Sequence, residues 1–154
     1  CQELQRLNVC YAEVRFCPTL HTLKGLTDEQ VVKAVVKGMQ ASPIEGGVIV
    51  CALRNLGPEH SLKMARLAAS SGAVGFDVAG YETGFPLTLH KQAIEYAVAC
   101  KNLGVTVHAG EWVNEGNEGE LMIDAAHHKQ IGQRFQWMKD SHVKTLMLNC
   151  ARQS

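Results

Sequence analysis

The sequence has 154 residues, of which 46% are hydrophobic and 19% are charged. Fifteen Lys and Arg residues balance fifteen Asp and Glu residues, so nothing indicates binding to nucleic acid or to an acidic membrane surface. The apolar fraction excludes a disordered chain, and no apolar run reaches the ~20 residues that span a bilayer. The chain starts at Cys1 without a signal peptide, and we expect it to begin inside a longer protein.

The elements follow one another in a regular order. Residues 9–16 are rich in strand-forming side chains and stop before Pro18, which predicts a strand and then a loop. A helix is expected over residues 27–40, with Thr27 as its N-cap and a break at Gly46 and Gly47. Further strands are predicted over 48–53, 74–79 and 105–109, and further helices over 59–70, 88–103 and 118–129.

Strands that alternate with helices indicate a parallel α/β sheet. Two architectures fit this order, an open doubly wound sheet and a (β/α)8 barrel, and the order alone does not separate them. In both, functional groups collect beyond the carboxyl ends of the strands. Those positions here hold Arg15, Arg54, residues 77–82 and residues 108–111.

The cysteines give a second, weaker indication. They stand at positions 1, 10, 17, 51, 100 and 150, with no C-x-x-C pair that would suggest a zinc finger or a redox motif. The chain is also unlike the small, loop-rich domains that depend on disulfides. We expect buried free thiols and a reducing, cytoplasmic compartment.

His108 and Glu111 form the sharpest candidate for chemistry. A histidine at the end of an apolar strand can present a ring nitrogen to a metal, and the small residues Ala109 and Gly110 leave room for a ligand. A carboxyl group at Glu111 could then move protons between a metal-bound water and a substrate. The alternative is a core histidine with a backbone hydrogen bond, followed by a helix-capping glutamate.

Gly80 lies in a second candidate segment, residues 76–82. Its amide could donate a hydrogen bond to a ring nitrogen of a flat substrate, although a plain strand-to-loop turn explains the same residues. We expect surface or capping roles for five of the other histidines, His21, His60, His90, His127 and His128. The glycine-rich motifs of nucleotide-binding loops are absent.

Three segments resemble the adenosine deaminase family. Residues 11–18 (YAEVRFCP) look like its third-strand motif, and residues 77–82 (DVAGYE) resemble its D-L-A-G-x-E motif. Residues 106–111 (TVHAGE) match its T-V-H-A-G-E motif in full. The resemblance implies a parallel (β/α)8 TIM-type barrel, of which this chain holds about half.

The resemblance also implies an activity and a set of site residues. Members of the family use zinc (Zn2+) to activate a water that replaces the amino group at C6 of adenosine, giving inosine and ammonia. By resemblance, His108 is a zinc ligand, Glu111 protonates the purine at N1, and Gly80 contacts purine N3 through its amide. Adenosine or deoxyadenosine would be the substrate.

The chain departs from the family pattern in three places. It has no H-x-H motif for two further zinc ligands, Gln133 stands where the family has a histidine, and the final S-x-x-x-D-D motif is absent. We therefore expect residues 1–132 to be a partial barrel and residues 133–154 a tail without family resemblance. The chain would be a fragment or a truncated isoform.

Two alternatives remain open for the function. The parent protein could deaminate a different 6-aminopurine, because residues outside this chain would shape the pocket. The chain could also be a non-catalytic isoform or binding chain that pairs with a full-length deaminase. Enough apolar residues are present for a core, but a partial barrel would leave sheet edges open, so we expect marginal stability.

Overall fold

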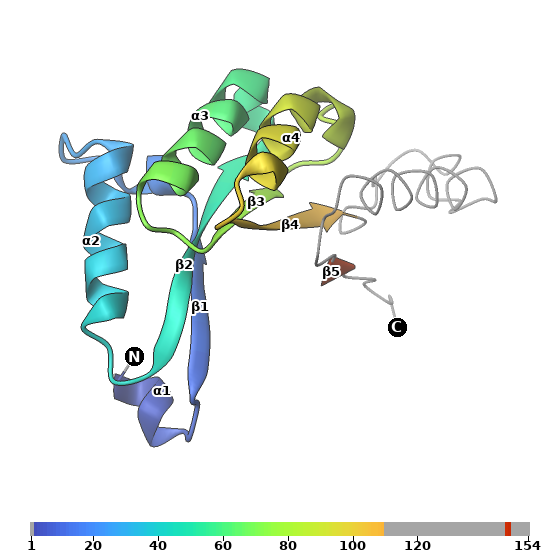
Figure 1. The fold of residues 1–154 in the computed structure, drawn as a ribbon. Helices are drawn as coiled ribbons and strands as arrows, with labels where there is room; N and C mark the ends of the chain where they lie inside the picture. The colour runs from blue at the N-terminus through green and yellow to red at the C-terminus, as the bar shows by residue number, and fades with distance from the viewer. Residues whose placement is uncertain (1, 110–146, 149–154) are drawn as a thin grey trace, which may run out of the picture.

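The computed structural model describes residues 2–109 and 147–148. A short helix, α1 (Gln2–Arg6), precedes the strand β1 (Tyr11–Phe16) and the 3-10 turn η1 (Pro18–His21). The remaining elements are α2 (Asp28–Gln40), β2 (Glu45–Leu53), η2 (Arg54–Leu56), α3 (Gly57–Ser70), β3 (Gly75–Ala79), η3 (Leu87–His90), α4 (Lys91–Ala99), β4 (Gly104–Ala109) and β5 (Met147–Leu148). Figure 1 shows this alternation of strands and helices.

The strands form one parallel sheet in the order β1-β2-β3-β4-β5. Val14 pairs with Val48, Val50 with Phe76, and Val78 with Val107, so the central strands lie in register through their apolar residues. Each pair of neighbouring strands is parallel. All carboxyl ends of the strands therefore meet at one edge of the sheet, as the sequence predicted.

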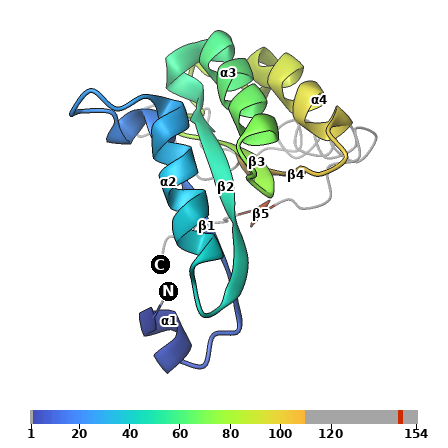
Figure 2. The same ribbon diagram turned by 60° about the vertical axis from the view of Figure 1, so that its left-hand side comes forward.

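One face of the sheet carries the hydrophobic core. Val50, Phe76, Val78 and Val107 are fully buried there, together with side chains from the three long helices. The helical residues of this core are Val32 and Met39 of α2, Met64, Ala65 and Ala68 of α3, and Ala93, Ile94 and Ala97 of α4. The helices α2, α3 and α4 thus pack on the same face, as Figures 1 and 2 show.

The opposite face of the sheet is polar. Because side chains alternate along a strand, Arg15, Cys51, Asp77 and His108 project away from the core that Val14, Val50, Val78 and Val107 build. A doubly wound sheet has helices on both faces, whereas a barrel has them on the outside only. Among the described residues the helices cover one face, which is the barrel arrangement.

The N-terminus of α2 confirms a sequence prediction. Thr27 caps the helix, because its side chain accepts a hydrogen bond from the amide of Gln30 while the Gln30 side chain accepts one from the amide of Thr27. The helix ends at Gln40.

Two predicted boundaries were wrong. Gly46 and Gly47 lie inside β2 instead of breaking a helix, and both are needed for close packing. A Cβ at Gly46 would lie 1.8 Å from the carbonyl oxygen of Ala12, and one at Gly47 would lie 2.3 Å from the Val74 side chain. The helix expected over residues 88–103 is divided into η3 and a shorter α4, which ends at Ala99.

The cysteines confirm the expected thiols only in part. Cys17 and Cys51 are free and buried, whereas Cys10 is free but exposed. Burial, followed by the nearby Asp77 carboxylate, raises the pKa of the Cys51 thiol far above its ordinary value. Cys51 is therefore an unreactive thiol.

Some predictions fall outside this description. The expected helix 118–129 lies outside the described residues, and so does most of the expected tail 133–154. Among the described helices, none is both long and apolar enough to cross a bilayer.

Candidate functional site

Three strands bring charged side chains together at the carboxyl edge of the polar face. Arg15 comes from β1, Asp77 from β3 and His108 from β4. Nδ1 of His108 lies 2.9 Å from Oδ2 of Asp77, and Nη1 of Arg15 lies 3.4 Å from the same carboxylate oxygen. The Asp77 side chain is fully buried, and the Arg15 guanidinium is the positive charge that faces it.

The Arg15 contact favours one tautomer of His108. Nη1 of Arg15 lies 3.4 Å from Nε2 of His108. A guanidinium only donates hydrogen bonds, so this contact favours the form with the lone pair on Nε2 and the proton on Nδ1. The Nδ1 proton then faces the Asp77 carboxylate at ion-pair distance, although the N–H direction is not aligned with Oδ2.

This arrangement fits one ligand of a zinc site. Histidines that bind metals usually hold one ring nitrogen against a carboxylate and use the other as the ligand. Nε2 of His108 has its lone pair available and its side chain is 27% exposed, but a metal there would have to replace the Arg15 contact. No group of three or more metal-binding side chains occurs among residues 2–109 and 147–148, so further ligands would have to come from elsewhere.

Arg54 joins the ends of three segments around this cluster. It follows β2 directly, and only 1% of its side chain is exposed. Its Nη1 donates to the carbonyl oxygen of Phe85 at 3.4 Å and lies 4.0 Å from Oε2 of Glu82, while its Nη2 donates to the carbonyl oxygen of His108. The loop after β3 and the end of β4 are thereby attached to one side chain.

Gly80 lies directly after β3 and close to Arg54 and Asn55, which follow β2. Its φ of +90° is in the region that favours glycine. A Cβ at this position would lie 3.0 Å from Oδ1 of Asn55 and 3.4 Å from the backbone nitrogen of Arg54. The sequence predicted that the backbone at the end of this strand would lie close to a ligand. In the structure the close neighbours of Gly80 are Asn55 and Arg54.

Glu111 lies outside the described residues, as do Gly110, His127, His128 and Gln133. His108 and Gly80 are therefore the two predicted site residues that the structure places. Both stand at the carboxyl ends of neighbouring strands, β3 and β4, and Arg54 contacts the segments on which they stand.

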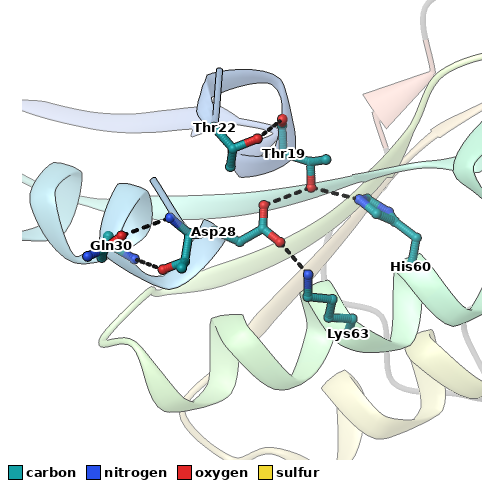
Figure 3. A network of polar contacts seen from close by, with 7 residues as sticks. Thr19, Thr22, Asp28, Gln30, His60 and Lys63 are labelled. Atoms are coloured by element: carbon teal, nitrogen blue, oxygen red, sulfur yellow. Dashed lines mark hydrogen bonds and ion pairs between the residues drawn. The ribbon is translucent and has the colours of Figure 1, made fainter. Parts of the chain in front are cut away.

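A second polar cluster clamps η1 and α2 to α3, and sequence reasoning missed it (Figure 3). The Thr19 hydroxyl donates to Asp28 at 3.0 Å and lies 3.0 Å from Nε2 of His60, while Lys63 contacts the same aspartate at 2.5 Å. Burial opposes the ionisation of Asp28, but the hydrogen bonds from Lys63 and Thr19 outweigh it and lower the pKa of Asp28.

His60 and His90 do not have the surface or capping roles that the sequence suggested. His60 lies within α3, where burial lowers its pKa, and His90 is almost fully buried with Nδ1 2.8 Å from the Ser61 hydroxyl. Burial and the neighbouring Arg54 lower the pKa of His90. One sequence signal pointed to the partial burial of His60. It is the fourth residue of α3, a helix with an apolar face.

The family model described as "Adenosine deaminase" matches residues 1–147. The chain belongs to the adenosine deaminase family. The match covers the strands and helices described above and extends into residues 133–147, where the motifs alone show no resemblance.

Curated relatives give the same family. A probable adenosine deaminase of Dictyostelium discoideum is 36% identical over 135 residues, which are 83% of this chain and 17% of that protein. Adenosine deaminase 1 of Streptomyces coelicolor is 40% identical over 122 residues, which are 71% of this chain and 30% of that protein. The chain therefore spans less than a third of the length of these two relatives.

Solved structures agree on the fold. The N6-methyl-AMP deaminase of Arabidopsis thaliana superposes with a TM-score of 0.68 at 20% identity, over 94% of this chain and 42% of that one. An amidohydrolase from Burkholderia ambifaria, solved with bound zinc, gives 0.68 at 20% identity over 90% and 36%. These likenesses concern the fold, and they show that this chain forms a part of a (β/α)8 barrel.

Proposed function

We propose that the protein to which this chain belongs catalyses the zinc-dependent hydrolytic deamination of adenosine to inosine and ammonia. The observation that carries the proposal is the Asp77–His108 pair at the carboxyl edge of the sheet, in a chain of this family. Catalytic groups of parallel barrels gather at that edge. Adenosine is preferred as the substrate because the curated relatives are adenosine deaminases.

In this proposal His108 contributes Nε2 to the metal. Asp77 faces the Nδ1 proton, so the imidazole keeps the tautomer in which Nε2 can act as a ligand. Arg15 balances the buried charge of Asp77. Zinc, when bound, supplies a water that is acidic enough to act as a nucleophile near neutral pH.

The remaining roles concern the purine ring. Gly80 would donate its backbone amide to N3, and a Cβ on this residue, whose φ is positive, would crowd Asn55. Glu111 would give a proton to N1, which makes C6 more electrophilic. Both roles rest on the match of residues 77–82 and 106–111 to the family motifs.

A substrate panel tests the proposal. The test uses the protein purified from its native source. Release of ammonia is measured from adenosine, deoxyadenosine, AMP and N6-methyl-AMP, with added zinc and with a chelator. We expect turnover of adenosine that the chelator abolishes, and a loss of at least 100-fold in Glu111→Gln. Faster turnover of a nucleotide would move the assignment to another 6-aminopurine, and absence of zinc-dependent turnover would overturn it.

Further expectations accompany this function. We propose a cytoplasmic location, a partial barrel in residues 1–132 and a tail without the family motifs in residues 133–154. Pairing with a full-length deaminase remains the alternative for a chain that lacks activity of its own. The intact mass of the native protein, compared with 16.8 kDa for this chain, decides whether the chain occurs by itself.

A further inference from the structure

Arg54 is the largest of the fully buried side chains, and its buried charge calls for an explanation. Burying a cation costs several kcal/mol unless hydrogen bonds and opposite charge compensate for it. An apolar residue could fill the same space at the end of β2 without this cost. The contacts of the guanidinium therefore indicate the role of Arg54.

The guanidinium contacts two segments that the proposed function uses. Through the carbonyl oxygen of Phe85 and the carboxylate of Glu82 it holds the loop after β3, which begins at Gly80. Through the carbonyl oxygen of His108 it holds the end of β4 at the residue assigned to zinc. The backbone nitrogen of Arg54 also lies 3.4 Å from the position of a Cβ on Gly80.

We infer that Arg54 is a positioning residue that couples the purine-binding loop to the zinc-binding strand end. It sets the separation between the Gly80 amide and the His108 ring by binding the carbonyl oxygen of His108 itself and that of Phe85, in the loop that Gly80 begins. This inference rests on the proposed function, because the two segments need a fixed spacing only if they serve one substrate. A misplacement of about 1 Å in such a site can cost on the order of 100-fold in rate.

The planar fork of arginine is what this role requires. Its terminal nitrogens diverge in a fixed geometry and can reach two carbonyl groups that belong to different segments. A lysine keeps the charge but has one ammonium on a flexible stem, so it cannot hold both segments at a fixed distance. Arg54→Lys therefore separates the loss of positioning from the loss of charge.

The test compares Arg54→Lys and Arg54→Gln with Arg66→Lys, in which an exposed arginine of α3 is changed. Zinc occupancy is titrated in metal buffers, and KM for adenosine is measured at saturating zinc. We expect Arg54→Lys to raise both the half-saturating zinc concentration and KM by about tenfold or more, because supporting residues of metal sites have effects of this size. Arg66→Lys should change neither value.

Each result has one meaning. If Arg54→Lys melts at a lower temperature but keeps the zinc affinity and KM of the wild type, Arg54 is merely structural and the inference is wrong. If only one of the two values changes, the coupling is wrong. If the wild type neither binds zinc nor deaminates a purine, the proposed function fails first and the inference falls with it.

Discussion

At the scale of single residues, Asp77 supplies the buried negative charge of the candidate site. Its fully buried carboxylate lies 2.9 Å from Nδ1 of His108 and 3.4 Å from Arg15. Asp77→Asn keeps the shape of the side chain but removes the charge that favours the metal-binding tautomer of His108. We expect zinc affinity to fall by about 10- to 100-fold, as measured by competition with a chelator.

The matched control for this prediction is Asp28→Asn. Asp28 is a buried aspartate with a lysine partner, Lys63, and it belongs to the clamp between α2 and α3. Its replacement should lower the melting temperature and leave zinc affinity unchanged. Equal zinc affinities in the two variants would show that Asp77 does not support His108.

Gly80 gives a second prediction at this scale. A methyl group there meets Asn55 at 3.0 Å on a backbone with φ of +90°, so Gly80→Ala should lower the free energy of unfolding by about 1–2 kcal/mol. Gly38→Ala is the matched control, because it lies in α2 with open space around it and should add stability, about 1 kcal/mol at most. Urea titrations measure both, and a neutral or stabilising Gly80→Ala would contradict the described loop.

At the scale of elements, the contacts between helices contain two histidines that resist protonation. The pKa values of His60 and His90 are lowered by burial, so the unfolded chain binds more protons than the folded one in mild acid. The two neutral histidines therefore contribute their full share of stability above the ordinary histidine pKa of ~6.5. That share is lost as the pH falls below this value toward the lowered pKa of the folded state. We expect the melting temperature of the native-source protein to fall between pH 7.5 and pH 5.

Variants identify the source of that acid sensitivity. His60→Gln and His90→Gln should each flatten the decrease, whatever they do to the melting temperature at pH 7.5. The range from pH 7.5 to pH 5 lies above the ordinary titration range of aspartate, so Asp28 does not contribute to it. A wild-type melting temperature that stays constant or rises toward pH 5 would show that these histidines are not buried.

The strands show which parts of the fold can be predicted from the sequence. Strands β2, β3 and β4 are short apolar runs buried in the sheet, and a pattern of this kind needs no tertiary information. Gly46 and Gly47 misled because glycine is usually a breaker, whereas here it lets Ala12 and Val74 approach the strand. That reason exists only in the assembled sheet.

The candidate site was predictable to a similar degree. His108 and Gly80 stand out by their place at strand ends and by their motifs, and the structure puts them on neighbouring strands. The cluster of Thr19, Asp28, His60 and Lys63 joins residues up to 44 positions apart (Figure 3). No local pattern marks such contacts, because they form only where η1 and the first residue of α2 meet α3 in the folded chain.

At the scale of the whole molecule, the sheet has an open side. Within the described ranges β1 pairs with β2 alone, and its other edge carries unpaired backbone groups. We expect residues 1–154, expressed by themselves, to associate and to unfold without a sharp transition. Sedimentation velocity with thermal melting checks this, and a monomer with a reversible, cooperative melt would contradict it.

The most direct measurement for the central claim is X-ray absorption at the zinc edge. The native-source protein and its His108→Ala variant are each loaded with one equivalent of zinc, and bound zinc is quantified beforehand. We predict imidazole nitrogen at about 2.0–2.1 Å from zinc in the wild type and, in the variant, a smaller imidazole contribution and weaker zinc binding. A wild type and variant with the same zinc content and the same spectrum would show that His108 is not a ligand.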